Sequence, residues 1–148
     1  AGDDRNTRSF MASPEPDKPQ TVAAAIDAIE ATYELMLAYA AQGRQSEEDD
    51  PLGVRAALRR ADAALDVLAA ATPTDLGAAG GTVAQATADM LTVLRQDIGN
   101  ARAAIRFVLA QRALGSQIID NLNASIHVRA LLTDLFLLDE ALNQAGTT

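Results

Sequence analysis

The chain has 148 residues and no cysteine, so it is long enough for one domain with its own hydrophobic core, and it excludes disulfides, thiolate metal sites and cysteine nucleophiles. Hydrophobic residues make up 49% of the chain and aromatic residues 3%, a composition typical of an all-α bundle with an aliphatic core. The formal net charge of −8 argues against nucleic acid and anionic membrane surfaces as partners.

Residues 1–20 combine charges with Pro14, Pro16 and Pro19, which restrict helix formation. The sequence predicts an extended or flexible tail over 1–20 and a single helical-bundle domain over 21–148. It contains no uncharged apolar run as long as a membrane span, and its amino end lacks the basic-then-apolar order of a signal peptide. We therefore expect a soluble protein of the cytoplasm.

The first predicted helix spans about 22–42, with Thr21 as its N-cap and Gly43 just beyond its end. Its core face carries apolar residues at helical spacing, namely Val22, Ile26, Ile29, Tyr33, Met36, Leu37 and Ala40. The reverse face is rich in alanine, which indicates that a second element approaches it closely. Asp27, Glu30 and Glu34 are the charges of this helix, and they form an acidic flank.

The second predicted helix follows the polar loop 44–50, with Asp50 as its N-cap and Pro51 at its first position. Its apolar residues alternate at spacings of four and three, as in antiparallel bundles, and are Val54, Leu58, Ala61, Leu65 and Leu68. The opposite face is expected to lie in solvent and carries Arg55, Arg59, Asp62 and Asp66. Breakers between Thr72 and Gly81 end the helix.

The third predicted helix begins after the N-cap Thr82 and continues to about Leu114. A single helix is favoured because its apolar residues stay on one face, namely Val83, Met90, Leu94, Ile98, Ala101, Ile105 and Val108. The alternative is a break at Gly99-Asn100, with Asn100 capping a fifth helix. In the unbroken helix Phe107 points away from this face, so another surface is expected to cover it.

The last predicted helix spans about 117–144 and follows a turn at Gly115-Ser116. Its apolar stripe rotates by roughly 180° between the two halves, at about 100° per residue. The helix therefore either bends near Ser125-His127 or serves two interfaces. The predicted fold is an antiparallel four-helix bundle, or a five-helix bundle if the third helix breaks.

A wide apolar surface on the last helix, an outward Phe107 and two helices longer than their neighbours predict a homodimer or higher oligomer. The candidate interaction surface consists of Phe107, Leu131, Leu132, Leu135, Phe136, Leu138 and Leu142. We expect the chain to bind itself and another protein through apolar helix faces, as an adaptor, a chaperone-like partner or an assembly component does.

Arg95, Arg102 and Arg106 form a stripe beside the apolar face of the third helix. The first helix carries acids and no base. This complementarity predicts contact between the three arginines and the acidic flank of the first helix, either within one chain or across a dimer.

A polar stripe on the last helix includes the only histidine of the chain and consists of Asp120, Asn123, His127 and Asp134. On one helix only Asn123 and His127 are close enough to act together, so a metal would need ligands from elsewhere. A b-type haem held by His127 and Met36 or Met90 fits a bundle, but core methionines that fill gaps are commoner. We predict a structural histidine, with no metal and no cofactor.

Four segments, in chain order, carry a resemblance to a known family: Gly2-Asp3-Asp4, Ile26 to Ala31, Gly80-Gly81-Thr82 and Leu131 to Phe136. They are similar to cobalamin adenosyltransferases, trimeric helix bundles, and the resemblance implies binding of ATP and a corrinoid. The chain departs from the family's catalytic stretch, because Gly99 and Asn100 stand where a carboxylate and an arginine are wanted. This enzyme is one alternative to an interaction protein, and a helical sensor domain is another.

Motifs of the common enzyme classes are missing from the sequence. The chain has no GxxxxGK[ST] phosphate loop, no GxGxxG segment and no Ser/His/Asp arrangement with nucleophile-elbow glycines. It also lacks the Glu-x-x-His pairs of di-iron bundles. The sequence therefore favours a non-catalytic protein.

Overall fold

The computed structural model describes residues 18–78 and 80–146, with side chains described through Gln144. These residues form no strand, and their helices are α2 (Val22–Ala40), α3 (Val54–Ala69), the short 3-10 helix η2 (Thr74–Leu76), α4 (Gly81–Leu109), α5 (Ser116–Ala124) and α6 (Ile126–Gly146). The predicted all-α fold is confirmed. Residues 1–17 of the predicted tail lie outside the described part of the chain.

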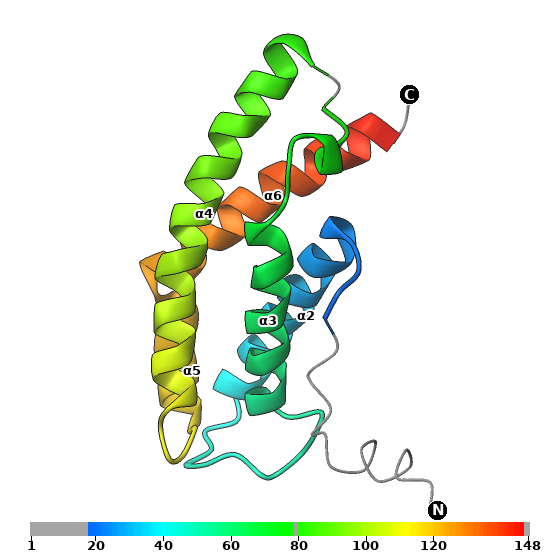
Figure 1. Ribbon diagram of the computed structural model, residues 1–148. Coiled ribbons are helices and arrows are strands. Elements are labelled where there is room, and N and C mark those ends of the chain that lie inside the picture. Colours follow the sequence, from blue (N-terminus) through cyan, green and yellow to red (C-terminus); the bar gives the residue numbers. More distant parts are fainter. Residues whose placement is uncertain (1–17, 79, 147–148) are drawn as a thin grey trace, which may run out of the picture.

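The helices form an antiparallel bundle in which the last element is divided in two. In Figure 1, α2 and α4 run downward and α3 and α5 run upward, so neighbours along the chain are antiparallel. The helix α2 packs against α3 and α5, and α4 packs against α3 and α6. Because α6 crosses α4 obliquely, the amino-terminal end of α4 extends beyond the other helices (Figure 1).

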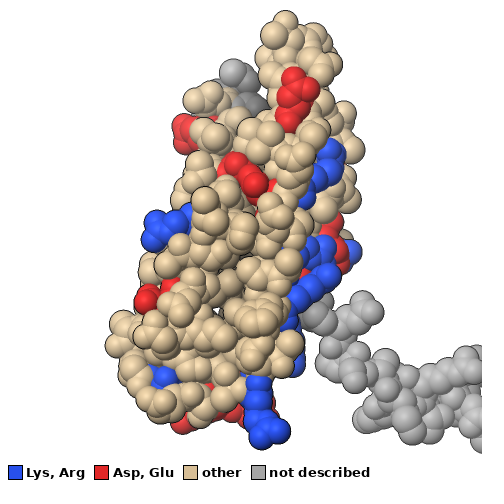
Figure 2. Space-filling model, turned by 90° about the vertical axis from the view of Figure 1, so that its left-hand side faces the viewer, with Lys and Arg blue, Asp and Glu red and all other residues tan. Residues whose placement is uncertain are grey.

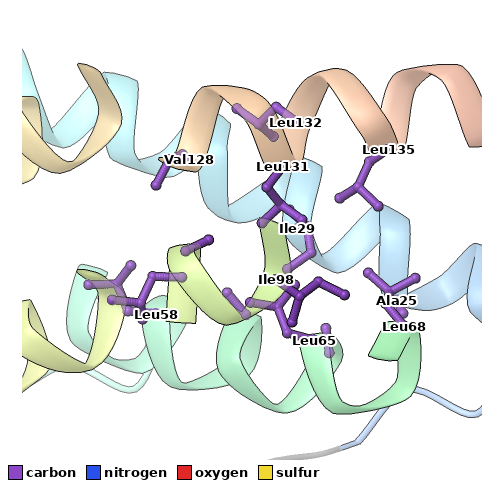
Figure 3. Packing of buried hydrophobic residues seen from close by; sticks show 14 of the residues in the cluster. Ala25, Ile29, Leu58, Leu65, Leu68, Ile98, Val128, Leu131, Leu132 and Leu135 are labelled. Atoms are coloured by element: carbon purple, nitrogen blue, oxygen red, sulfur yellow. The ribbon is translucent and has the colours of Figure 1, made fainter. Parts of the chain in front are cut away.

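The core is aliphatic and lies where all the helices meet. Figure 3 shows Ile29 of α2, Leu58 and Leu65 of α3, Ile98 of α4 and Leu131 of α6 pointing toward one another. One apolar cavity of about 30 Å³ remains among these helices, lined in part by Ile29, Leu58 and Leu131. A cavity of this size holds about one water molecule.

The helices α2 and α3 approach each other through small side chains. Ala25 of α2 and Ala57 of α3 are buried, and the Thr32 hydroxyl lies 3.3 Å from the Ala57 carbonyl oxygen, to which it donates a hydrogen bond. This close approach does not use the alanine-rich face for which it was predicted: of that face only Ala28 and Leu35 pack partly against the core, and Ala38 is exposed. Ala24 and Ala31 remain exposed.

The N-cap residues confirm the predicted start of α2 and correct the predicted start of α3. The Thr21 hydroxyl accepts a hydrogen bond from Ala24 N–H at 3.0 Å, as expected of the N-cap of α2. The helix α3 begins at Val54 rather than Pro51, with Gly53 as N-cap. The reason is a turn in which the Asp50 carboxylate accepts a bond from the backbone N–H of Leu52 and the Asp50 carbonyl accepts one from Gly53 N–H.

The third predicted helix is continuous through Gly99, as favoured from the sequence, because α4 spans Gly81–Leu109. It begins two residues earlier than predicted, with Gly80 rather than Thr82 as N-cap, and it ends five residues before Leu114. The early end follows from a clamp formed by Arg55 and Glu47.

The clamp joins the start of α3 to the loop after α4. The Arg55 guanidinium donates to the carbonyl oxygens of Leu109 at 2.7 Å and Gln111 at 3.0 Å, and to the Glu47 carboxylate at 2.6 Å. Glu47 in turn accepts a hydrogen bond from Leu114 N–H. These partners satisfy carbonyl groups that a longer helix would have satisfied internally.

Replacing Arg55 tests this clamp. Arg55→Met is expected to lower the free energy of unfolding by about 2 kcal/mol, because Glu47 and two carbonyl groups lose their donors in a half-buried site. The matched control is Arg59→Met, one turn further along α3, where the side chain is exposed and a change within about 0.5 kcal/mol is expected. Urea unfolding curves of the two variants measure the difference, and equal losses would contradict the clamp.

The predicted bend in the last helix is confirmed as a complete break. Ser125, with ψ at 135°, separates α5 from α6, and its N–H donates to the Leu122 carbonyl. The break lets both halves turn their apolar stripes to the same core, so Ile119 of α5 and Leu135 of α6 are both fully buried. None of the helices in the described residues is both long and apolar enough to cross a bilayer.

Candidate interaction surface

The amino-terminal turns of α4 project from the bundle and contain only exposed and half-buried residues. No described residue between 81 and 90 is buried, and the first buried residue of α4 is Leu91. Val83 is 66% exposed. Asp89 is the only charged residue between positions 81 and 94. A helix that projects into water usually carries more charged residues and fewer exposed apolar ones than these turns do.

A second apolar stripe lies beside the core stripe of α4. We name it the outer stripe; it consists of Val83, Ala86, Met90, Val93, Asp97, Asn100, Ala104 and Phe107. Val83 and Met90 were predicted to lie on the core face, but Val83 is exposed because the core does not extend to it, and Met90, like Ala104, packs only partly against the core. The alternating spacings of three and four place these residues along one side of the helix. Val93 is 44% exposed and Phe107 is 66% exposed. The expectation that Phe107 points away from the core is therefore confirmed, and within the described chain nothing buries it.

The side of the molecule on which α4 lies is poor in charge. Figure 2 views this side and shows a broad uncharged surface with a few isolated charged side chains. Positive side chains gather instead along one edge of this view.

Most residues of the predicted interaction surface on α6 are buried in the core, and only Phe136 among them is largely exposed. Leu131, Leu132, Leu135 and Leu138 are each at most 6% exposed and belong to the core of the chain itself. Leu142 packs partly against the same core. Phe136 at 52% and its neighbour Leu137 at 61% are the exposed apolar residues in this part of α6.

The reason for this correction is the break at Ser125. The break reorients α6, so that its leucine stripe meets α4 and the core. In an unbroken helix the same stripe would point away from α4 and the core. The exposure of Leu137 was not predicted, because Leu137 lies beside Leu138 in a run of apolar residues.

The four residues of the predicted polar stripe also do not share one environment: two are buried and two are exposed. Asn123 and Asp134 are buried, at 6% and 7% exposure, and each has one side-chain oxygen without a hydrogen-bond partner. Asp120 and His127 are exposed. The backbone N–H of His127 donates to the Ser125 hydroxyl at 3.2 Å, which caps α6 after the break. Within the described residues, no three histidine or carboxylate side chains are placed to hold a metal ion.

Asp134 meets a second carboxylate that the sequence reasoning did not single out. Burial, and next the hydrogen bond and charge of Asp97 on α4, raise the pKa of Asp134 to about 7. The available signal was the place of Asp97 next to Ile98, close to the core stripe of the third helix.

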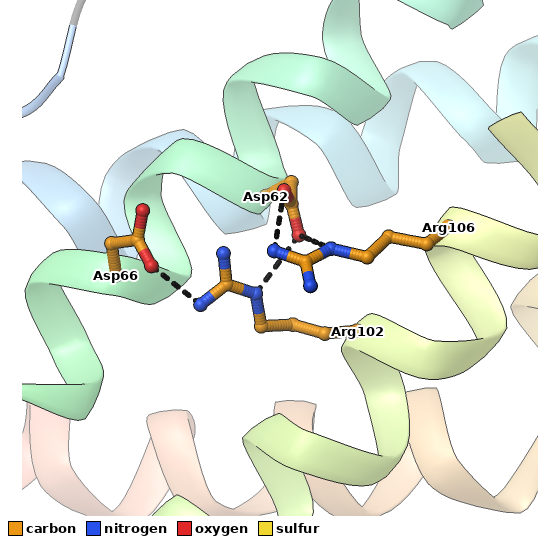
Figure 4. A network of polar contacts seen from close by, with 4 residues as sticks. All are labelled: Asp62, Asp66, Arg102 and Arg106. Atoms are coloured by element: carbon orange, nitrogen blue, oxygen red, sulfur yellow. Dashed lines mark hydrogen bonds and ion pairs between the residues drawn. The ribbon is translucent and has the colours of Figure 1, made fainter.

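The three arginines of α4 turn to α3 rather than to α2, and Figure 4 shows two of them, Arg102 and Arg106. Arg102 donates to Asp62 at 2.9 Å and also to Asp66, and Arg106 donates to Asp62 at 3.3 Å. The hydrogen bond from Arg102 holds the pKa of Asp66 below its ordinary value. Asp62 and Asp66, expected to lie in solvent, thus form a partly buried network between two helices.

Arg95 completes the contact between α4 and α3. It donates to the carbonyl oxygens of Ala69 and Ala71 at 3.1 Å, and so caps the end of α3. In the described residues no ion pair joins the arginines of α4 to Asp27, Glu30 or Glu34, so the predicted contact within one chain is wrong. Burial first, and then Asp139 of α6, raise the pKa of Glu30.

Comparison of the chain with known protein families, with curated proteins and with solved structures finds no match.

Proposed function

We propose that the chain is a non-catalytic interaction module that forms a homodimer, in which the outer stripe of α4 packs against the same stripe of a second copy. The observation that carries this proposal is the projection of α4, whose turns over 81–90 contain no fully buried residue. A helix of this kind gains most of its stability from tertiary packing of an apolar side. A partner would supply the packing that the chain does not.

A second copy suits the outer stripe because the stripe is self-complementary. If two α4 helices pair antiparallel about Arg95, Val83 lies opposite Phe107 and Ala86 lies opposite Ala104, so the two ends of the stripe are complementary. In the middle, Met90 lies opposite Asn100 and Val93 lies opposite Asp97. Two-fold symmetry requires such reciprocal contacts. The helix has 29 residues, or about 43 Å, so the pairing would extend over most of its length.

The charge of the surface supports the same occupant. The outer stripe contains one ionisable residue, Asp97, in a chain whose net charge is −8. Two negatively charged chains associate most readily where each presents an uncharged face. Dimerisation through α4 would leave Phe136 and Leu137 of α6 exposed for another protein, which fits the role of an adaptor or assembly component.

The ATP- and corrinoid-binding alternative gains no specific support from the geometry. The apolar cavity of the core measures about 30 Å³, far below the size of a nucleotide or a corrinoid. Two larger surface pockets measure about 490 and 380 Å³, but Asp66 and Asp75 line the first and the acidic run Glu47 to Asp50 lines the second, which disfavours the anionic phosphates of ATP. Gly99 and Asn100, which interrupt the family's catalytic stretch, lie exposed in the middle of α4.

The proposed dimer predicts a loss of self-association when charge enters the outer stripe. Wild-type chain is expected to have twice the monomer mass in light scattering at high micromolar concentration. Val83→Glu and Val93→Glu are expected to weaken the dimer about 30-fold or more, because a charged side chain would be buried without a partner. Both residues are exposed in the single chain, so circular dichroism should show unchanged helix content.

The matched control is Leu52→Glu. Leu52 is 76% exposed but lies in the loop before α3, away from the outer stripe, so this variant should remain dimeric. A strictly monomeric wild type would contradict the proposal. A dimer weakened by Leu52→Glu and not by Val83→Glu would place the interface elsewhere.

A further inference from the structure

A second apolar surface lies where α2 and α6 meet, and it shares no residue with the outer stripe of α4. Leu37 of α2 is 46% exposed, and Phe136 of α6 is 52% exposed. Each has an apolar neighbour one turn earlier on its helix, Tyr33 and Leu132, and these two residues line the same cavity between the helices. We name these four residues the α2–α6 edge.

The interior beneath the α2–α6 edge is apolar. Thr32 is the one polar residue among those that line the cavity of about 30 Å³. Its hydroxyl donates to the backbone carbonyl oxygens of Ala28 and Ala57 and is therefore satisfied within the chain. An apolar side chain laid on the edge would leave no polar group of this lining without a partner.

Carboxylates flank the edge on both helices. Asp27, Glu30 and Glu34 form the acidic flank of α2, at spacings of three and four. On α6, Asp139 lies one turn after Phe136. The charge of Asp139 acts on Glu30 across the two helices, so the carboxylates of α2 and α6 belong to one acidic region.

No cation in the described part of the chain neutralises this region. None of its four carboxylates takes part in an ion pair there. Arg95 and Arg102 of α4 bind α3 instead. Arg129, the one arginine of α6, is exposed. The edge is thus an apolar surface between carboxylates that have no partner of opposite charge in the same chain.

We propose that the α2–α6 edge binds a basic amphipathic helix of a partner protein, whose apolar side lies on the edge and whose lysines or arginines meet the acidic region. The proposal goes beyond the proposed dimer and does not depend on it. It specifies the kind of protein that the exposed part of α6 recognises.

A helix suits this edge because two neighbouring helices present their side chains at the same spacing as a third. Tyr33 and Leu37, like Leu132 and Phe136, are four residues apart, which matches apolar anchors at one-turn intervals on a docked helix. A second copy of the chain is disfavoured as the occupant, because its net charge is also −8. A basic partner would instead be attracted by that charge.

A synthetic peptide tests the proposal on the full chain. The probe is an amphipathic helix of about 18 residues, with leucines on one side and lysines on the other. Fluorescence anisotropy at about 0.15 M salt measures its binding. Leu37→Ser and Phe136→Ser should each weaken binding about tenfold, and so should Glu34→Lys. These side chains are exposed, so circular dichroism should show unchanged helix content.

Matched controls come from the loop before α3, where Leu52 and Asp49 are exposed. Leu52→Ser and Asp49→Lys should change the affinity by less than about twofold. The same peptide with glutamate in place of lysine should not bind. Val83→Glu should bind the lysine peptide as tightly as wild type does, whether or not the chain dimerises through α4.

Nuclear magnetic resonance locates the bound peptide. Backbone amide resonances of residues 30–37 and 132–140 should shift on addition of the peptide. Shifts confined to the acidic loop 47–50, or equal losses of affinity in Leu37→Ser and Leu52→Ser, would mean that charge alone attracts the peptide and would refute the proposal. A lack of binding at high micromolar concentration would do the same. If Leu37→Ser and Phe136→Ser abolished self-association in light scattering, a second copy and not a basic helix would occupy the edge.

Discussion

Leu135→Ala is expected to lower the free energy of unfolding by about 2–5 kcal/mol. Leu135 is fully buried. Its side chain points from α6 into the core that α6 shares with α2, α3 and α4 (Figure 3). Truncation to alanine removes apolar contacts and leaves a cavity in a core that is already closely packed. The loss is a property of the single chain and does not require an oligomer.

The adjacent position provides the control. Phe136 has a larger side chain but is 52% exposed, so Phe136→Ala should change stability by less than about 1 kcal/mol. Urea unfolding followed by far-UV circular dichroism compares the two variants under the same conditions. The reverse order would mean that α6 is rotated by about 100°, one residue, from the orientation described.

Periodicity in the sequence was sufficient for the fold class and for most of the core. The apolar residues of α4 stay on one side through Gly99, which favoured a continuous helix. The rotation of the stripe near Ser125 predicted either a bend or two interfaces, and the structure shows the bend. Both features depend on local spacing alone. Val54, Leu58 and Leu65 were likewise placed in the core from their spacing and are buried.

Periodicity could not predict which helices pack against each other. Spacing shows which side of a helix is apolar, but not which neighbour meets it. For this reason Arg102 was assigned to the acids of α2, whereas it binds Asp62 and Asp66 of α3. Complementary charges were equally available on both helices, and the choice was made by the packing of α4 against α3.

The same limit explains why the Asp97 and Asp134 pair was missed. The two residues are 37 positions apart (134 minus 97), and each alone resembles an ordinary charged residue at the edge of an apolar stripe. Their meeting depends on the crossing of α4 and α6, which in turn depends on the break at Ser125. The leucines predicted to form an interface became core residues for the same reason.

Stability is expected to fall as the pH rises through neutrality, and Asp134→Asn should abolish most of this fall. The folded-state pKa of Asp134 is raised to about 7 by burial and then by Asp97, whereas the unfolded chain has the ordinary aspartate value of about 3.9. Between these values the folded state binds more protons than the unfolded state. The stabilisation is therefore fully present below the unfolded pKa and is lost as the pH rises through the folded pKa.

The expected loss in wild type is about 4 kcal/mol between about pH 4 and about pH 8, since each pKa unit corresponds to about 1.4 kcal/mol. The raised pKa of Glu30 acts in the same sense at the acidic end of this range, in wild type and in the variants alike. The lowered pKa values of Glu47 and Asp66 act in the opposite sense and only below the ordinary carboxyl range. Urea unfolding of wild type, Asp134→Asn and the exposed control Asp120→Asn across this range separates them. Wild type and Asp120→Asn should lose stability together toward alkaline pH while Asp134→Asn stays level, and parallel curves for all three would refute the assignment of the raised pKa to Asp134.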